Sequence, residues 1–117
     1  MYYKTKLGKS GEEAAKQYLI EKNYKIIEQN FRTKLGEIDI IAKDENELVF
    51  IEVKTRTSNT YGSPCEAVDE EKLKHILRVA EYYIYIKKLE KAFIRFDVLE
   101  VMIEKGKTKI NHLKQII

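Results

Sequence analysis

Hydrophobic residues recur at helical spacing in two parts of the chain. The first part, Gly11 to Lys22, begins beside Ser10 and Glu13, which have the spacing of a capping box at a helix start. Its apolar stripe consists of Ala14, Ala15, Tyr18 and Leu19. Asn23 is expected to end this helix in a left-handed turn, because asparagine tolerates that conformation.

A second helix is expected after Asp69, a residue type that caps helices well. One face has the spacing of a buried stripe, formed by Leu73, Ile76, Leu77, Ala80 and Ile84. The opposite side carries basic and aromatic residues, namely His75, Arg78, Tyr82 and Tyr85. Three interpretations apply to that side: packing on neighbouring structure, a dimer contact, or a nucleic-acid surface.

Other segments are rich in β-branched and aromatic residues, which is typical of strands. Strands are expected over Tyr24–Glu28, residues 38–42, residues 48–53, Phe93–Ile103 and Ile110–Ile117, the last as an edge strand after a turn at Lys105–Lys107. The segment Thr55–Pro64 is rich in turn formers and is expected to be a mobile loop. This order predicts an α/β fold: a mixed central β-sheet flanked by α-helices, in a single domain over residues 1–117.

The strands at residues 38–42 and 48–53 predict a hairpin that carries charge. If it closes through a two-residue loop at residues 45–46, Asp39 faces Glu52 and Glu37 faces Lys54. The period of two then projects all four side chains from a single side of the sheet. Glu-Asn is a weaker turn signal than Asn-Gly, so this register holds only if no bulge intervenes.

Two facing carboxylates repel each other, and a shared cation removes that repulsion. Mg²⁺ is a candidate, because it is a hard ion held by one or two carboxylates, waters and substrate phosphates. Asp39 and Glu52 would hold it, while Lys54 orients a water or stabilises charge on a phosphate. The alternative is a polar hairpin face with surface ion pairs of little energetic value. Leu48 and Phe50 share the parity of Glu52, which indicates that this face is partly covered.

Composition narrows the class of protein. The chain has 117 residues, 44% hydrophobic and 35% charged, as expected of a soluble globular protein. It shows neither a membrane-spanning stretch nor a secretory signal, so a cytoplasmic location is expected. The net charge of +3 suits a polyanionic partner and equally an ordinary solvated surface.

Cys65 is the only cysteine, and metal binding by His75 or His112 is not expected, because neither has a carboxylate or cysteine at ligand spacing. Arg95 and Asp97 share a strand face and are expected to form structural ion pairs.

Asp39 followed by Glu52-Val53-Lys54 resembles the PD-(D/E)XK nuclease motif, with Ile38 in place of the proline that names it. The surrounding sequence resembles the bacterial YraN family, which is grouped with Holliday junction resolvase-like endonucleases. The similarity covers nearly the whole chain: Gly11-Glu12, Ala15, Tyr18, Leu19, Asn30, Arg32, Gly36-Glu37-Ile38-Asp39, Phe50-Ile51-Glu52-Val53-Lys54, Arg56, Tyr61-Gly62, Pro64 and Arg95-Phe96-Asp97-Val98.

The resemblance implies a restriction endonuclease-like fold and a role for each residue of the motif. Asp39, Glu52 and the backbone carbonyl of Val53 would bind the metal, and Lys54 would be catalytic. Glu12 matches an additional acidic residue on the first helix of resolvase-like nucleases, although an acid there also favours the helix dipole. Three roles are open for Glu37: pairing with Lys54, contacting a second metal, or none. Candidate phosphate contacts are Arg32, Lys34, Arg56, Lys72 and Arg78.

The expected function is therefore a Mg²⁺-dependent endonuclease acting on DNA, with Mn²⁺ as a substitute and branched DNA as a candidate substrate. Symmetric cutting would require a homodimer, in contact through Tyr82 and Tyr85 or through the carboxyl-terminal strand. One alternative is a nucleic-acid-binding or scaffold module that keeps the fold without catalysis. Another is a hydrolase of small phosphoesters, which the lack of a glycine-rich phosphate loop and of histidine ligands disfavours.

Overall fold

The computed structural model describes residues 6–57 and 70–117. In chain order its elements are α1 (Lys6–Glu21), β1 (Lys25–Thr33), β2 (Gly36–Asp44), β3 (Glu47–Thr57), α2 (Glu70–Ile86), β4 (Phe93–Glu104) and β5 (Lys107–Leu113). The five strands form one mixed sheet with two helices, an α/β fold consistent with the restriction-endonuclease-like class. Among the described residues, neither helix has the length and apolarity needed to cross a membrane.

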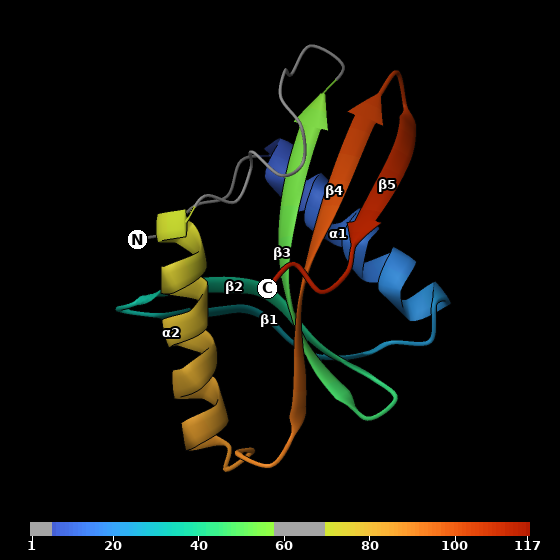
Figure 1. Ribbon diagram of the computed structural model, residues 1–117. Coiled ribbons are helices and arrows are strands. Elements are labelled where there is room, and N and C mark those ends of the chain that lie inside the picture. The colour runs from blue at the N-terminus through green and yellow to red at the C-terminus, as the bar shows by residue number, and fades with distance from the viewer. Residues whose placement is uncertain (1–5, 58–69) are drawn as a thin grey trace.

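The sheet keeps the strands in chain order, from β1 at one edge to β5 at the other. Strands β3 and β4 are parallel and the other neighbouring pairs are antiparallel. Figure 1 shows β1 and β2 running past α2 to one side, while β3, β4 and β5 rise together with α1 on their far face. The sheet is therefore two strand groups that share one short stretch of pairing between β2 and β3.

Each helix covers its own side of the sheet with a separate hydrophobic cluster. The α1 cluster contains Ala15, Leu19, Tyr24, Ile40, Ala42, Val49, Ile51, Val53, Leu99 and Val101. The α2 cluster contains Ile38, Ile41, Leu48, Phe50, Ile76, Val79, Ala80, Tyr83 and Phe96. Leu48 and Phe50 thus lie under α2, which confirms that the side of β3 carrying Glu52 is partly covered.

The buried face of α2 is rotated from the predicted one. Ile76 and Ala80 are buried as expected, but Leu77 is 36% exposed, and the other buried residues are Val79 and Tyr83. Tyr83 is drawn inward because its ring packs edge-on against Phe31 and Phe50. The prediction placed Leu77 in the core because it has the helical spacing of the apolar stripe, and spacing alone does not show which aromatic residues a helix buries.

Helix α1 ends where it was predicted to end and begins earlier. Asn23 has φ of 70°, and the amide of Tyr24 donates to the Leu19 carbonyl at 2.9 Å, as in a left-handed helix end. The predicted capping box is wrong, because the helix starts at Lys6 and Ser10 lies inside it. Gly11 is buried, and a Cβ on it would overlap the side chain of Thr55 on β3. The absence of a side chain at Gly11 therefore lets α1 approach β3 closely.

We expect Gly11→Ala to destabilise the protein by about 1–3 kcal/mol, although alanine favours helices, because the added methyl group has no room. Urea unfolding followed by circular dichroism measures this loss. Ser10→Ala, at an exposed position one residue away, is the control and should leave stability unchanged or slightly higher. Adding Thr55→Ala to the Gly11 variant removes two of the overlapping atoms and should restore part of the loss. A Gly11→Ala protein as stable as its parent would contradict the close approach.

The strands differ in their bounds from the prediction, and the differences are largest for β1, β3 and β5. Strand β1 continues to Thr33, and β3 continues to Thr57, where a loop was expected, because its last residues pair with β4. Strand β5 ends at Leu113, and the chain then turns so that the Ile116 amide donates to the Phe96 carbonyl at 2.9 Å. The turn at residues 105–107 is confirmed, with positive φ at Lys105 and Gly106. The predicted helix cap at Asp69 and the rest of the predicted loop lie outside the described residues.

Candidate functional site

The candidate site lies where β2 separates from β3. The predicted hairpin register is confirmed from Asp44–Glu47 to Ile40–Ile51, and the ladder ends there. The expected pairing of Asp39 with Glu52, and of Glu37 with Lys54, is therefore wrong. Beyond Ile40, β2 stays paired with β1 and β3 stays paired with β4, so the two strands part.

The Asp39 side chain links β2 to β3 at the point where the two strands begin to part. Its carboxylate Oδ2 accepts a hydrogen bond from the Val53 amide at 2.8 Å, in the place where a strand partner would otherwise bond. The Asp39 side chain is 8% exposed, so this bond is made away from bulk water. The same bond fixes the orientation of the carboxylate and brings the Val53 backbone beside it.

Three carboxylates gather at the separation, from two elements. Glu12 on α1 and Glu37 and Asp39 on β2 each offer an oxygen, and these oxygens lie within 4.8 Å of one another. We call these residues the carboxylate cluster. Glu12 reaches it because α1 packs closely on β3 at the adjacent Gly11. Carboxylate oxygens are the donors that hard divalent cations prefer.

Glu52 on β3 faces two lysines. Its Oε1 lies 2.6 Å from Nζ of Lys72 on α2 and 3.8 Å from Nζ of Lys54. Burial, and then the nearby negative charge of Asp39, raise the pKa of Glu52 to about 7. Asp39 and Glu52 are not paired in the sheet, but both line one cavity.

The two lysines differ in their electrostatic surroundings. Burial and the adjacent Lys72 lower the pKa of Lys54 below its usual value, although Glu52 and Asp39 oppose this. For Lys72, burial also acts to lower the pKa, but hydrogen bonds with Glu52 and Lys54 raise it above the usual value. Lys54 is therefore the better proton acceptor of the two, and Lys72 the more persistent positive charge.

A cavity of about 240 Å³ opens beside these groups. It is lined by Gly36, Glu37, Asp39, Glu52, Lys72, His75 and Ile76. His75 is a residue that the sequence interpretation assigned to the outer side of the second helix. Its position three residues after Lys72, one helical turn on, is the signal that links it to the same face.

The predicted phosphate contacts are distributed unevenly around this cavity. Lys72 lines it, and Arg32 lies 3.8 Å from Glu37, a residue of the lining. Arg56 forms an ion pair with Glu100 on β4 at 2.9 Å. Lys34 is exposed in the turn between β1 and β2, and Arg78 lines a second hollow on α2 beside His75. Of these five residues, Lys72 is the one that lines the cavity.

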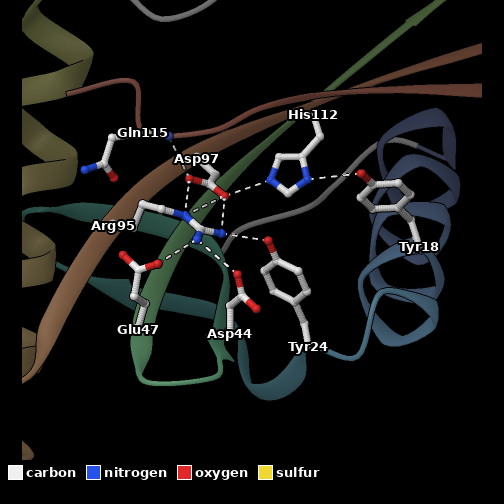
Figure 2. Close-up of polar contacts among 8 residues, drawn as sticks. All are labelled: Tyr18, Tyr24, Asp44, Glu47, Arg95, Asp97, His112 and Gln115. Carbon is white, nitrogen blue, oxygen red and sulfur yellow. Dashed lines mark hydrogen bonds and ion pairs between the residues drawn. The ribbon is translucent and has the colours of Figure 1, made fainter.

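A second polar cluster lies on the α1 side of the sheet (Figure 2). Arg95 contacts Asp97 at 2.9 Å, and Asp44 and Glu47 at 3.0 Å each, which confirms the predicted structural ion pair. His112 lies 2.7 Å from Asp97, so it has the carboxylate partner that its sequence neighbours did not reveal. The cluster joins β4 to the β2–β3 turn and to β5.

Asp97 makes the stability of the fold sensitive to acid. Burial acts against its charged form, but hydrogen bonds from His112 and Arg95 lower the pKa of Asp97 below its usual value. A depressed carboxyl pKa stabilises the fold above the unfolded-state value of about 3.9, and this stabilisation is lost as pH falls toward the folded-state value. We expect the stability difference between the parent and Asp97→Asn to be largest at neutral pH and to narrow below about pH 4. Urea unfolding between pH 7 and pH 3 measures it; a constant difference would contradict the depressed pKa.

Comparison with known proteins shows that the chain is similar in sequence to the members of one family. The sequence model described as "Uncharacterised protein family UPF0102" matches residues 11–101, which include the carboxylate cluster, Glu52, Lys54 and Lys72. A UPF0102 protein of Caldicellulosiruptor saccharolyticus is 51% identical over 98 residues, covering 84% of this chain and 83% of the relative. A UPF0102 protein of Clostridioides difficile is 50% identical over 107 residues, covering 91% of each. A UPF0102 protein of Alkaliphilus metalliredigens is 52% identical over 107 residues, covering 92% and 93%.

Proposed function

We propose that this chain, which belongs to the UPF0102 family, is a metal-dependent endonuclease of the PD-(D/E)XK type that hydrolyses phosphodiester bonds of DNA. One observation carries the proposal: acidic groups from β2 and β3 line one cavity together with Lys72 of α2, at the point where the sheet opens. Glu12 of α1 lies beside the β2 carboxylates, and Lys54 lies 3.8 Å from Glu52. A surface patch of ion pairs would not require three elements to meet in a partly buried hollow.

The donor set at this site fits Mg²⁺ or Mn²⁺. Among the described residues its candidate ligands are carboxylate oxygens, which hard divalent cations prefer. Asp39, Glu52 and the Val53 carbonyl would hold the ion, with Glu12 and Glu37 adding negative charge. The two backbone groups of a strand residue point to the same edge, so the Val53 carbonyl lies on the side of its Asp39-bonded amide. When bound, such an ion supplies Lewis-acid stabilisation of the phosphate and lowers the pKa of a water.

The two lysines would supply proton transfer and contacts to the phosphate. Lys54 is held near Glu52, and its lowered pKa suits it to accept a proton from the attacking water or to stabilise charge on the phosphate. Lys72 carries a persistent charge at the rim of the cavity, where it can contact a substrate phosphate. His75 lines the same cavity and is a further group within reach of the substrate.

Branched DNA is a candidate substrate, and a resolvase must cut a junction on two strands. This requires two sites and hence a second copy of the chain. Tyr85 is 73% exposed and Phe93 72% exposed, so apolar surface is available near the carboxyl end of α2 for such a contact. DNA as substrate also agrees with the expected cytoplasmic location.

The test is incubation of the purified protein with Mg²⁺ or Mn²⁺ and with labelled single-stranded, linear duplex and four-way DNA. We expect cleavage of at least one form, and none when EDTA removes the cation. Tight binding of DNA without cleavage, across all cations and forms, would instead identify a binding module. Cleavage that persists in EDTA would refute the metal-dependent mechanism.

A further inference from the structure

The face of the sheet that carries Lys54 continues into the β4–β5 hairpin, which is rich in lysine. We call this face the catalytic face. In the register of β3, β4 and β5, Lys54 aligns with Glu100 and Asn111, and the next such row aligns Arg56 with Met102 and Lys109. The row after that aligns Glu104 with Lys107. Residues that pair across neighbouring strands point to the same face. Lys107 and Lys109 therefore share the face of Lys54.

The two faces of this part of the sheet differ in character. The opposite face is apolar and packs against α1 through Val53, Val101 and Ile110. On the face of Lys54, the residues of the hairpin end are exposed and charged, and a shallow hollow there is lined by Met102, Glu104, Lys105, Lys107 and Lys109. Figure 1 shows the β4–β5 hairpin at the end of the sheet where β3 also ends.

We propose that Lys105, Lys107 and Lys109, the hairpin lysines, bind the sugar–phosphate backbone of duplex DNA on one side of the bond to be cut. This inference rests on the proposed nuclease function, which supplies the position of the scissile phosphate. The acidic residues on this face are fewer than the basic ones, and one of them, Glu100, is already paired with Arg56 at 2.9 Å. The hairpin end is thus positively charged on the side that faces substrate.

The spacing of the rows fits a DNA backbone. Lys107 lies four residues along the strand direction from the row of Lys54, which is about 13 Å at roughly 3.3 Å per residue. With a rise of about 3.4 Å per base pair, this distance corresponds to about four base pairs. Contacts to phosphates at that distance would set the position of the duplex without reading its sequence.

Lysines on β5 also have a simpler role, because β5 is an edge strand and lysines discourage edge-to-edge aggregation. Two features favour DNA binding. Lys107 and Lys109 lie on the catalytic face, whereas Thr108 and Ile110 between and beyond them lie on the other. Lys105 lies in the turn between β4 and β5, so it adds positive charge there without protecting the unpaired edge of a strand.

The decisive experiment measures binding of a labelled duplex of about 30 base pairs in EDTA, over a series of salt concentrations. We expect Lys107→Ala with Lys109→Ala to weaken binding about tenfold and to lower the slope of log affinity against log salt by about two. The control is Lys25→Ala with Lys43→Ala, an exposed pair that faces each other across β1 and β2. The control should change affinity less than about twofold, and Lys107→Arg with Lys109→Arg should keep the parental slope.

The outcomes separate this inference from the nuclease proposal. An unchanged affinity and slope in the folded alanine variant would overturn the role of the hairpin lysines, as would aggregation with unchanged affinity in the monomeric fraction. A parent that binds no duplex would also overturn it. If the alanine variant shows the expected loss while the parent cleaves no DNA with any cation, the hairpin lysines bind DNA and the nuclease proposal alone fails.

Discussion

Glu52→Gln is expected to slow DNA cleavage by about a thousandfold while the fold persists. The amide has almost the same shape as the carboxylate but lacks the negative charge that would bind the cation and position Lys54, 3.8 Å away. Single-turnover cleavage of a labelled duplex at saturating Mg²⁺ measures the rate. Circular dichroism and urea unfolding without metal show whether the variant is folded.

The matched control is Glu13→Gln, which makes the same chemical change at an exposed residue next to Glu12, outside the cavity. It should cleave at the parental rate. A second readout does not depend on activity: a cation bound by the native state at 100 times its Kd adds about 2.7 kcal/mol of stability. The parent should therefore melt at a higher temperature in Mn²⁺, and Glu52→Gln should lose most of this increase. Parental cleavage in Glu52→Gln would exclude this site as the catalytic one.

Arg95→Met is expected to reduce the free energy of unfolding by about 3–5 kcal/mol, because it leaves the buried Asp97 carboxylate without its guanidinium partner. Asp97 is 1% exposed, and the Arg95 guanidinium donates to it and to Asp44 and Glu47 (Figure 2). The loss is a large share of the roughly 5–15 kcal/mol of a typical domain. Urea unfolding, at reduced temperature if necessary, measures it.

Two further variants test the explanation. Glu47→Gln removes a carboxylate whose side chain is 41% exposed, so it should cost less than about 1 kcal/mol. Replacing both partners, Arg95→Met with Asp97→Leu, removes the uncompensated charge and should recover part of the loss. An Arg95→Met protein within about 1 kcal/mol of its parent would show that the cluster contributes little to stability.

The two polar clusters differ in how their charges are balanced. At the β2–β3 separation, Glu37, Asp39 and Glu52 line one cavity, so like charges lie close together and the pKa of Glu52 is raised. The Arg95 cluster lies on the α1 side, where each carboxylate has a cation or donor and the pKa of Asp97 is lowered. Opposed pKa shifts of this kind are typical of a reactive site and of a structural site respectively.

Local patterns were sufficient for features that depend on neighbouring residues. The left-handed end of α1 at Asn23 follows from the tolerance of asparagine for positive φ. The hairpin register up to Ile40–Ile51 follows from a two-residue loop and the period of two. The association of Arg95 with Asp97 follows from their shared strand face. These features need no knowledge of distant parts of the chain.

Other features depend on contacts between distant segments and were missed. The length of β3 is set by its pairing with β4, about 46 residues later in the register, so turn-forming residues there still form a strand. The early start of α1 and the inward rotation of Tyr83 depend on what each helix packs against. Propensity ranks residue types, but packing partners decide which of them are buried.

The sequence by itself determined the chemical groups of this protein: two acids and a lysine at strand spacing, a turn that aligns them approximately, and a basic surplus. Only the tertiary structure decided how they meet. Strand β2 leaves β3 at Asp39, Gly11 lets α1 bring Glu12 to the opening, and α2 places Lys72 against Glu52. These three contacts join residues far apart in the chain, and their free energies come from packing and burial that no local pattern records.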